Sequence, residues 1–162
     1  MQELLKHVEH IPLGSARGLV FLDTCFIIDS LSHPDKVSRL LKIGKLALTS
    51  FNVEELMHVE HRLHHEIRKN MRLFLRHDDF KIVDIPVHPG SPESEKSFVR
   101  GIDNDLLLNV PDPSDAVLIA AAITTKSTIL TKDKHHLFTT RLENFLNKYG
   151  IKVYKDLHTL TG

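Results

Sequence analysis

Short apolar runs alternate with longer segments of helical periodicity along most of this chain. The first run, GLVFLD at residues 18–23, is apolar throughout and ends in Asp, which is typical of a strand buried on both faces. Further strands are predicted at 45–50, 80–87, 127–133 and 151–155. Strands that alternate with helices build right-handed βαβ units, so this order predicts a parallel sheet with helices on both faces.

The segments between the strands have apolar residues at helical spacing. They predict helices at 24–32, 36–44, 52–77, 92–109, 115–125 and 142–150, and a short helix at 2–10. The helix at 52–77 is long, with an apolar face and a face rich in His and Arg. We therefore predict a single domain over residues 1–162, with residues 1–17 as an N-terminal extension. Its fold class is α/β, with three layers (α/β/α) and a central, mainly parallel sheet of five strands.

Composition places the chain among ordinary soluble proteins. Its 162 residues are 41% hydrophobic and 26% charged, which is enough for one core without disulfides. No apolar run approaches the roughly 20 residues that span a bilayer. The N-terminus, MQELLKHVEH, does not resemble a signal peptide. These features predict a cytoplasmic protein with no membrane contact, and predict that the single cysteine, Cys25, is a small buried residue with no metal or redox role.

The charges cancel overall but are unevenly placed. The chain has 21 basic and 21 acidic residues, so its net charge does not indicate a polyanionic partner. Residues 58–77, however, carry more basic than acidic side chains and several histidines. This segment predicts a local basic face, for which an ordinary solvated helix surface is the alternative interpretation. The candidate phosphate contacts on it are Arg62, Arg68, Lys69 and Arg72.

Four acidic residues follow strand ends or begin helices in a way that brings them to one edge of the predicted sheet. Asp23 ends the first strand, and Glu55 lies in the first turns of the helix after the second. Asp115 begins a helix that leads into the strand ending at Asp133. Because that helix and strand are antiparallel, Asp115 and Asp133 return to the same edge. Ligands of open α/β sheets bind at this carboxyl edge.

Four converging carboxylates repel one another, and burying them unpaired is costly. A hard divalent cation removes the difficulty, and Mg²⁺ or Mn²⁺ accepts an all-oxygen ligand set. Such a site suits phosphodiester hydrolysis, in which the metal lowers the pKa of the attacking water and stabilises the developing charge.

Each acid also has a purely structural interpretation. Asp23 and Asp133 are suitable N-caps, and Asp115 complements a helix dipole behind a Ser114 cap. Glu55 taken alone reads as a surface residue, and Glu54 beside it leaves the second ligand ambiguous. The joint placement of the four acids favours a functional site.

Four short motifs make the chain resemble the PIN-domain nucleases, a family that includes VapC-type toxins and several RNA-processing enzymes. They are FLDTCFIIDSL, LTSFNVEELMHV, SDAVLIAAA and ILTKDKHHL, in that order. The resemblance implies that Asp23, Glu55, Asp115 and Asp133 are the acidic metal-binding quartet, flanked by the hydroxyls of Thr24 and Thr131. Leu56 after Glu55 matches the Glu-Leu pattern of the family and favours Glu55 over Glu54.

The resemblance further implies an endoribonuclease that depends on Mg²⁺ or Mn²⁺, cuts RNA by attack of metal-activated water and leaves a 5′-phosphate. A homodimer is expected. If the protein is a toxin, an antitoxin protein is its expected partner. An RNA-processing PIN nuclease unrelated to toxins, and a non-catalytic PIN-like module that binds RNA or protein, are the alternatives.

Three other functions fit the residues less well. His58, His61, His64 and His65 have helical spacing that suits Zn²⁺ or Ni²⁺, but a polar helix face explains them equally well. A phosphatase with an Asp nucleophile needs a second acid two residues after Asp23, where Cys25 stands. No Gly-rich phosphate loop follows a strand.

Overall fold

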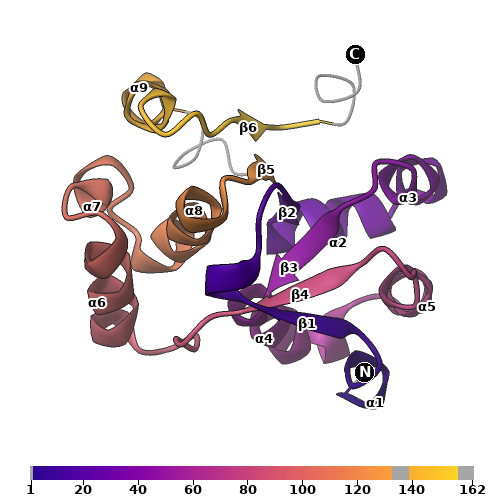
Figure 1. Cartoon of the computed structure of the whole chain (residues 1–162). Coiled ribbons are helices and arrows are strands. Elements are labelled where there is room, and N and C mark those ends of the chain that lie inside the picture. Colours follow the sequence, from indigo (N-terminus) through magenta and orange to yellow (C-terminus); the bar gives the residue numbers. More distant parts are fainter. Residues whose placement is uncertain (1, 133–138, 157–162) are drawn as a thin grey trace.

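The computed structural model describes residues 2–132 and 139–156, in which helices and strands alternate from one end to the other (Figure 1). The strands are β1 (Glu9–Pro12), β2 (Val20–Leu22), β3 (Leu46–Thr49), β4 (Lys81–Asp84), β5 (Thr128–Leu130) and β6 (Val153–Tyr154). The α-helices are α1 (Gln2–Leu5), α2 (Thr24–Leu31), α3 (Pro34–Leu41), α4 (Ser50–Val59), α5 (His65–Leu75), α6 (Pro92–Ile102), α7 (Leu106–Asn109), α8 (Pro113–Thr125) and α9 (Thr140–Asn147). Two short 3-10 turns, η1 (Leu13–Ser15) and η2 (Glu60–Arg62), complete the order.

The strands form one parallel sheet in the order β1-β4-β3-β2-β5-β6. The predicted α/β class and parallel sheet are therefore confirmed, but the predicted count of five strands is wrong, because the sheet has six. The additional strand, β1, overlaps the end of the short helix predicted at 2–10, in which only α1 is helical. Its sequence EHIP has no apolar run because three of its four side chains are exposed at the sheet edge. It pairs with β4 through its backbone.

Two hydrophobic clusters, one on each face of the sheet, make the three layers. Alternate residues of each strand point to opposite faces. Phe21 and its β5 partner Ile129 belong to the cluster beneath α6, α7, α8 and α9. Leu22 and its partner Leu130 belong to the cluster beneath α2, α3, α4 and α5. Figure 1 shows these two helix groups on opposite sides of the strands. The predicted α/β/α arrangement is confirmed.

Helix α8 is apolar on all sides because it is packed between the sheet and α6. Its side chains from Ala116 to Ala122 are all buried. Asp112 caps its N-terminus by accepting from the backbone N–H of Ser114 at 2.9 Å and of Asp115 at 3.4 Å. The helix ends at Lys126, whose φ of 51° turns the chain directly into β5. The start of α8 and the end of β5 therefore lie at the same edge of the sheet.

The prediction of one long helix over 52–77 is wrong, because α4 and α5 are separate helices. Between them lie η2 and Leu63, whose backbone is extended (φ −78°, ψ 146°). His64 then caps α5, since its ring nitrogen accepts from the N–H of Glu66 at 3.3 Å. The apolar spacing continues across the break because both helices pack on the same face of the sheet. The helix predicted at 92–109 is likewise divided, into α6 and α7, at the extended residue Asp103.

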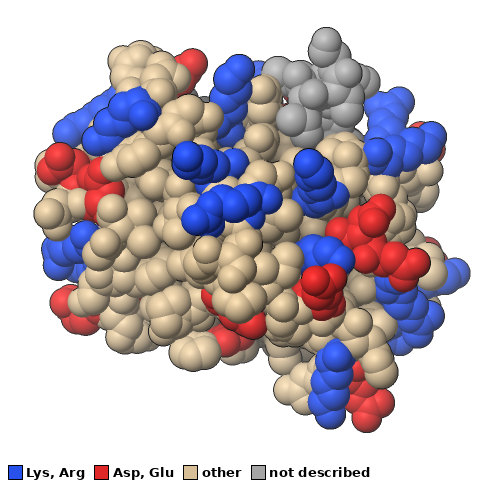
Figure 2. Space-filling view, viewed as in Figure 1, with Lys and Arg blue, Asp and Glu red and all other residues tan. Residues whose placement is uncertain are grey.

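Among residues 2–132 and 139–156, no helix is both long enough and apolar enough to cross a membrane. Basic and acidic side chains are mixed over the face of the molecule drawn in Figure 2, as expected for a chain with zero formal net charge.

Candidate active site

Three of the four predicted acids lie together at the carboxyl edge of the sheet. Asp23 directly follows β2, and its backbone N–H donates to the carbonyl of Leu130 on β5 at 2.9 Å. Glu55 lies in the second turn of α4, which begins where β3 ends. Asp115 lies in the first turn of α8. Asp23 and Asp115 are both close enough to raise the pKa of Glu55. The fourth predicted acid, Asp133, is outside the described residues.

Both carboxylate oxygens of Asp23 accept hydrogen bonds. Oδ1 accepts from the backbone N–H of Thr24 at 2.8 Å, so the residue does cap α2. Oδ2 accepts from the Thr131 hydroxyl, just beyond β5, at 2.7 Å. Capping of α2 does not require the hydrogen bond from Thr131. That bond links the end of β5 to the end of β2 through the Asp23 carboxylate.

Glu55 is partly buried, and one of its two carboxylate oxygens accepts two hydrogen bonds. Its Oε1 accepts from the Thr24 hydroxyl at 3.1 Å and from the side-chain amide of Asn52 at 3.0 Å. The pKa of Glu55 is raised to about 7, first by burial and then by the negative charges of Asp23 and Asp115, and the hydrogen bonds from Thr24 and Asn52 partly offset these effects. Glu55 is thus an acid held where its negative charge is poorly stabilised.

The neighbouring Glu54 has a different environment. Its Oε1 lies 2.5 Å from Nδ1 of His88, which belongs to the segment after β4. The two adjacent acids therefore have separate partners, and only Glu55 shares hydrogen-bond partners with the Asp23 region. The contacts favour Glu55 over Glu54 as the member of the acidic set.

At the start of α8, the expected cap is replaced by another residue. The structure shows Asp112, not Ser114, in the N-cap position. The Ser114 hydroxyl instead donates to Glu95 of α6 at 2.6 Å, and Glu95 is only 2% exposed. Asp115 occupies the first turn behind the Asp112 cap, where the helix dipole favours a negative charge.

Cys25 lies at the acidic site. The prediction that it is buried is wrong, because its side chain is exposed. The residue is exposed in the first turn of α2. Its Sγ lies 3.5 Å from Asp23 Oδ2 and 3.6 Å from the Thr131 hydroxyl oxygen. Partial burial of the sulfur and, next, the Asp23 carboxylate raise the pKa of the Cys25 thiol, so it remains protonated at neutral pH.

The donor chemistry of this site fits a divalent cation. Asp23, Glu55 and Asp115 offer carboxylate oxygens, which Mg²⁺ and Mn²⁺ prefer. Among the described residues, the charges with the largest effects on the pKa of Glu55 are the negative charges of Asp23 and Asp115. Within that same part of the chain, no three His, Cys, Asp or Glu side chains are grouped closely enough to hold a metal ion. The fit therefore rests on the oxygen donors and on the repulsion of Glu55 by the negative charges of Asp23 and Asp115.

The predicted basic residues lie on η2 and α5. Arg62, Lys69 and Arg72 are exposed and Arg68 is half-buried. A shallow groove along α5 is lined by His65, Arg68, Lys69, Arg72, Leu73 and Arg76. Within the described ranges, none of the four predicted cations forms an ion pair with a carboxylate. They form a basic surface that is available to an anionic partner.

The histidines do not form the alternative metal site. His58 is in α4, His61 is in η2, His64 caps α5 and His65 begins it. The break between the helices removes the continuous helical spacing on which the Zn²⁺ or Ni²⁺ interpretation depended. No metal-holding group of His, Cys, Asp or Glu is found where side chains are described.

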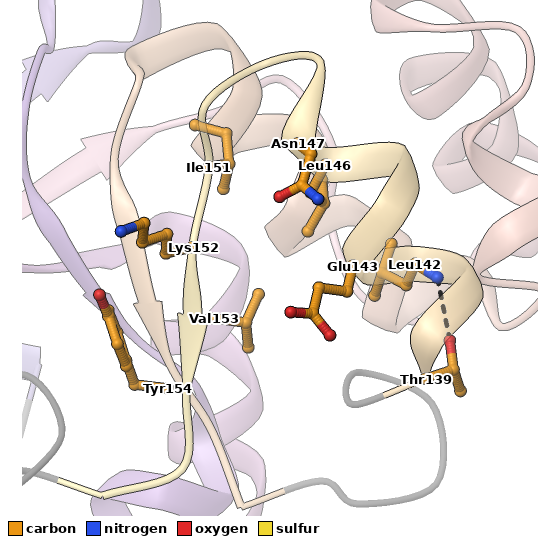
Figure 3. Close-up of a pocket in the computed structure, with 9 residues that line it drawn as sticks. All are labelled: Thr139, Leu142, Glu143, Leu146, Asn147, Ile151, Lys152, Val153 and Tyr154. Atoms are coloured by element: carbon orange, nitrogen blue, oxygen red, sulfur yellow. Dashed lines mark hydrogen bonds between the residues drawn. The ribbon is translucent and has the colours of Figure 1, made fainter.

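A second groove, of about 440 Å³, lies between α9 and β6 (Figure 3). Leu142, Leu146, Ile151 and Val153 supply most of its apolar lining. Thr139 accepts from the backbone N–H of Leu142 at 3.1 Å and so caps α9. None of Asp23, Glu55 and Asp115 lines this groove. It is therefore separate from the acidic site.

The raised pKa of Glu55 predicts how the metal-free protein responds to pH. Between its ordinary pKa of 4.5 and its folded-state pKa of about 7, the folded protein binds a proton more readily than the unfolded chain. The free energy of unfolding therefore falls as pH rises through this window. We expect Glu55→Gln in EDTA to be more stable than wild type at pH 8, on the order of 1 kcal/mol after allowing for partial solvent exposure.

This difference should vanish near pH 3, well below the ordinary pKa of 4.5, where Glu55 is neutral in both the folded and the unfolded state. Urea unfolding of the two proteins at both pH values measures it, with Glu54→Gln as the control. A Glu55→Gln protein less stable than wild type at pH 8 would contradict the raised pKa of Glu55 in the folded protein.

Comparison with known proteins supports the resemblance inferred from the motifs. A family model described as the PIN domain matches residues 20–140, well over half of the chain. A chain from the crystal structure of VapBC2 from Rickettsia felis, bound to a DNA fragment from their promoter, has a similar fold. Its TM-score is 0.51 at 14% sequence identity, covering 85% of this chain and 99% of that chain. No curated protein matches the sequence. The chain belongs to the PIN domain family.

Proposed function

We propose that this protein is a divalent-metal-dependent endoribonuclease that hydrolyses RNA phosphodiester bonds. The observation that carries the proposal is the meeting of Asp23, Glu55 and Asp115 at the carboxyl edge of the sheet, where burial and mutual repulsion raise the pKa of Glu55 to about 7. PIN domains are generally nucleases that use divalent metal ions, and the chain is a member of that family.

Asp23, Glu55 and Asp115, together with Asp133, would hold Mg²⁺ or Mn²⁺. When bound, the ion would lower the pKa of the attacking water and stabilise negative charge on the phosphate oxygens. Cleavage would leave a 5′-phosphate. Thr131 holds Oδ2 of Asp23, and Thr24 holds Oε1 of Glu55. These hydroxyls keep the carboxylates from turning away from the site before substrate arrives.

RNA would be positioned by the basic surface of Arg62, Arg68, Lys69 and Arg72. Three of these side chains are exposed, and none is neutralised by a carboxylate among the described residues. Lys and Arg contacts to phosphates supply most of the sequence-independent affinity of nucleic-acid binding. The RNA sequence or structure that is cut would be selected by further contacts on the same surface.

The similarity to a chain of the VapBC2 complex favours a toxin role over general RNA processing. In this role the protein would be a homodimer, and an antitoxin protein would cover its acidic edge. Expression of the nuclease alone should then arrest growth, and co-expression of the neighbouring reading frame should restore it. Growth that is unaffected by an active nuclease would instead favour an RNA-processing enzyme.

The nuclease proposal is tested by incubating purified protein with end-labelled single-stranded and hairpin RNAs in Mn²⁺, Mg²⁺ or EDTA. We expect 5′-phosphorylated fragments with either metal and none with EDTA. Asp23→Asn protein purified in parallel should be inactive, which excludes a contaminating ribonuclease. Binding of metal and RNA without cleavage of any substrate would overturn the enzyme proposal in favour of a non-catalytic binding module.

A further inference from the structure

Asn52 is a polar side chain that the acidic set does not include, yet it lies inside the site. It is in the first turn of α4 and only 3% exposed. A buried side-chain amide must find hydrogen-bond partners for its oxygen and its NH₂ group, because leaving them unpaired is costly. The partners it has are Thr49, Thr24 and Glu55.

Thr49 accounts for the amide oxygen. The Thr49 hydroxyl oxygen accepts from the backbone N–H of Asn52 at 3.0 Å, which is the N-cap bond of α4. Its own proton is donated to Asn52 Oδ1 at 2.6 Å. Thr49 is itself fully buried, so no solvent competes for this proton.

The amide NH₂ group then faces the acidic site with both of its protons. One is donated to Glu55 Oε1 at 3.0 Å and the other to the Thr24 hydroxyl oxygen at 3.1 Å. A flipped amide would place its oxygen against the Glu55 carboxylate oxygen, so that two acceptors would face each other. The arrangement that satisfies Thr49, Thr24 and Glu55 together is therefore the one observed.

The direction of the remaining hydrogen bond, between Thr24 and Glu55, follows from the other hydrogen bonds of this network. Because the Thr24 oxygen accepts from Asn52, its proton is donated to Glu55 Oε1 at 3.1 Å. Oε1 thus receives two hydrogen bonds, whereas no described residue donates to Oε2. The carboxylate is fixed in rotation with one oxygen saturated and the other left for a ligand.

We propose that Asn52 is a positioning residue that holds Glu55 in its metal-binding orientation by donating from its side-chain amide to Oε1. The inference rests on the proposed function, because the ligand of Oε2 is the divalent ion. Asn52 does not touch that ion; it acts only through Glu55. Groups that orient metal ligands in this way typically change metal affinity by roughly 10- to 100-fold when removed.

The test is the affinity of RNA-free protein for Mn²⁺. This affinity is measured by titration calorimetry or from the electron paramagnetic resonance signal of free Mn²⁺. We expect Asn52→Leu, which has a similar volume and no donor, to bind Mn²⁺ roughly 10- to 100-fold more weakly than wild type. Thr24→Val, which removes the second donor to Oε1 with little change of shape, should weaken binding by a smaller factor. It keeps the test decisive if Asn52→Leu does not fold.

A double-mutant cycle separates positioning from a general loss of structure. In a Glu55→Gln background, Asn52→Leu should cause no further loss of Mn²⁺ affinity, because its effect passes through Glu55. Asn70→Leu is the matched control: the Asn70 amide donates to the Leu31 carbonyl at 2.9 Å, outside the acidic site. We expect that change to lower stability and leave Mn²⁺ affinity unchanged.

Three results would overturn the proposal, and the third has a different meaning from the first two. Wild-type affinity in Asn52→Leu, or an equal loss in both backgrounds, would refute the positioning role while leaving the nuclease proposal intact. No Mn²⁺ binding by wild-type protein at millimolar concentration would refute both, since the ligand that Glu55 is positioned to bind would then be wrong.

Discussion

Glu55→Gln is expected to lower metal-dependent RNA cleavage at least about a thousandfold, which corresponds to about 4 kcal/mol of lost transition-state stabilisation. The amide keeps the size of the side chain but removes a negative charge that would help to hold the ion. Glu54→Gln, one residue earlier, should stay within about threefold of wild type. Its carboxylate contacts His88 rather than the hydroxyl and amide that hold Glu55.

This pair of variants is a sharp comparison because the two residues are chemically identical and adjacent on one helix. Single-turnover cleavage at saturating Mn²⁺ measures the chemical step without interference from product release. If Glu54→Gln were the inactive variant, Glu54 and not Glu55 would be the metal ligand supplied by α4. If both variants were fully active, the proposal of a metal site at this edge would fail.

Neutralising the basic surface of α5 is expected to weaken RNA binding with little effect on the chemical step. The triple variant Arg68→Gln, Lys69→Gln and Arg72→Gln should raise the Kd for single-stranded RNA by roughly 10- to 100-fold at low salt. If each residue contacts one phosphate, the dependence of log affinity on log salt concentration should become shallower by about 2, at roughly 0.7 for each contact. Fluorescence anisotropy in the Glu55→Gln background measures both quantities without cleavage.

A control with the same change of charge is available on the other side of the sheet. Arg100 on α6, Arg141 on α9 and Lys152 before β6 are exposed, and they also comprise two arginines and one lysine. Figure 1 shows α6 and α9 away from α5. Their triple Gln variant should bind RNA as wild type does. Stronger weakening by the control than by the α5 variant would place the RNA on the opposite face.

The order of elements and the acidic edge were predictable because they depend on local patterns. Buried strands require apolar runs, and helices that pack on a sheet require apolar residues at helical spacing. A parallel sheet brings the carboxyl ends of its strands to one edge. Asp23, Glu55 and Asp115 could therefore be grouped before the structure was known. Asp133 lies outside the described residues, so its place in the set stays a prediction.

Errors arose where local pattern and tertiary contact differ. The edge strand β1 has mostly exposed side chains and pairs through its backbone, so hydropathy does not reveal it. The break between α4 and α5 is invisible to periodicity because both helices face the same core. Cys25 lies in an apolar stretch, but its position in the first turn of α2 leaves it exposed.

Asn52 shows the same limit within the site. Its spacing of three residues from the N-cap Thr49 and three residues from Glu55 was a usable signal, since residues three apart at a helix start share a face. Spacing does not reveal that the amide is buried or that it also reaches Thr24, which is far away in sequence. Nor does it reveal that Glu54 contacts His88.

By itself, the sequence determined the parallel α/β class, the succession of elements and the edge at which the acids meet, because each follows from burial periodicity along a short stretch. Only the tertiary structure revealed the sixth strand, the division of the long helix, the different contacts of Glu54 and Glu55, and the hydrogen bonds of Asn52. These depend on hydrogen bonds between residues distant in the chain, and the geometry of such bonds exists only after the layers have packed.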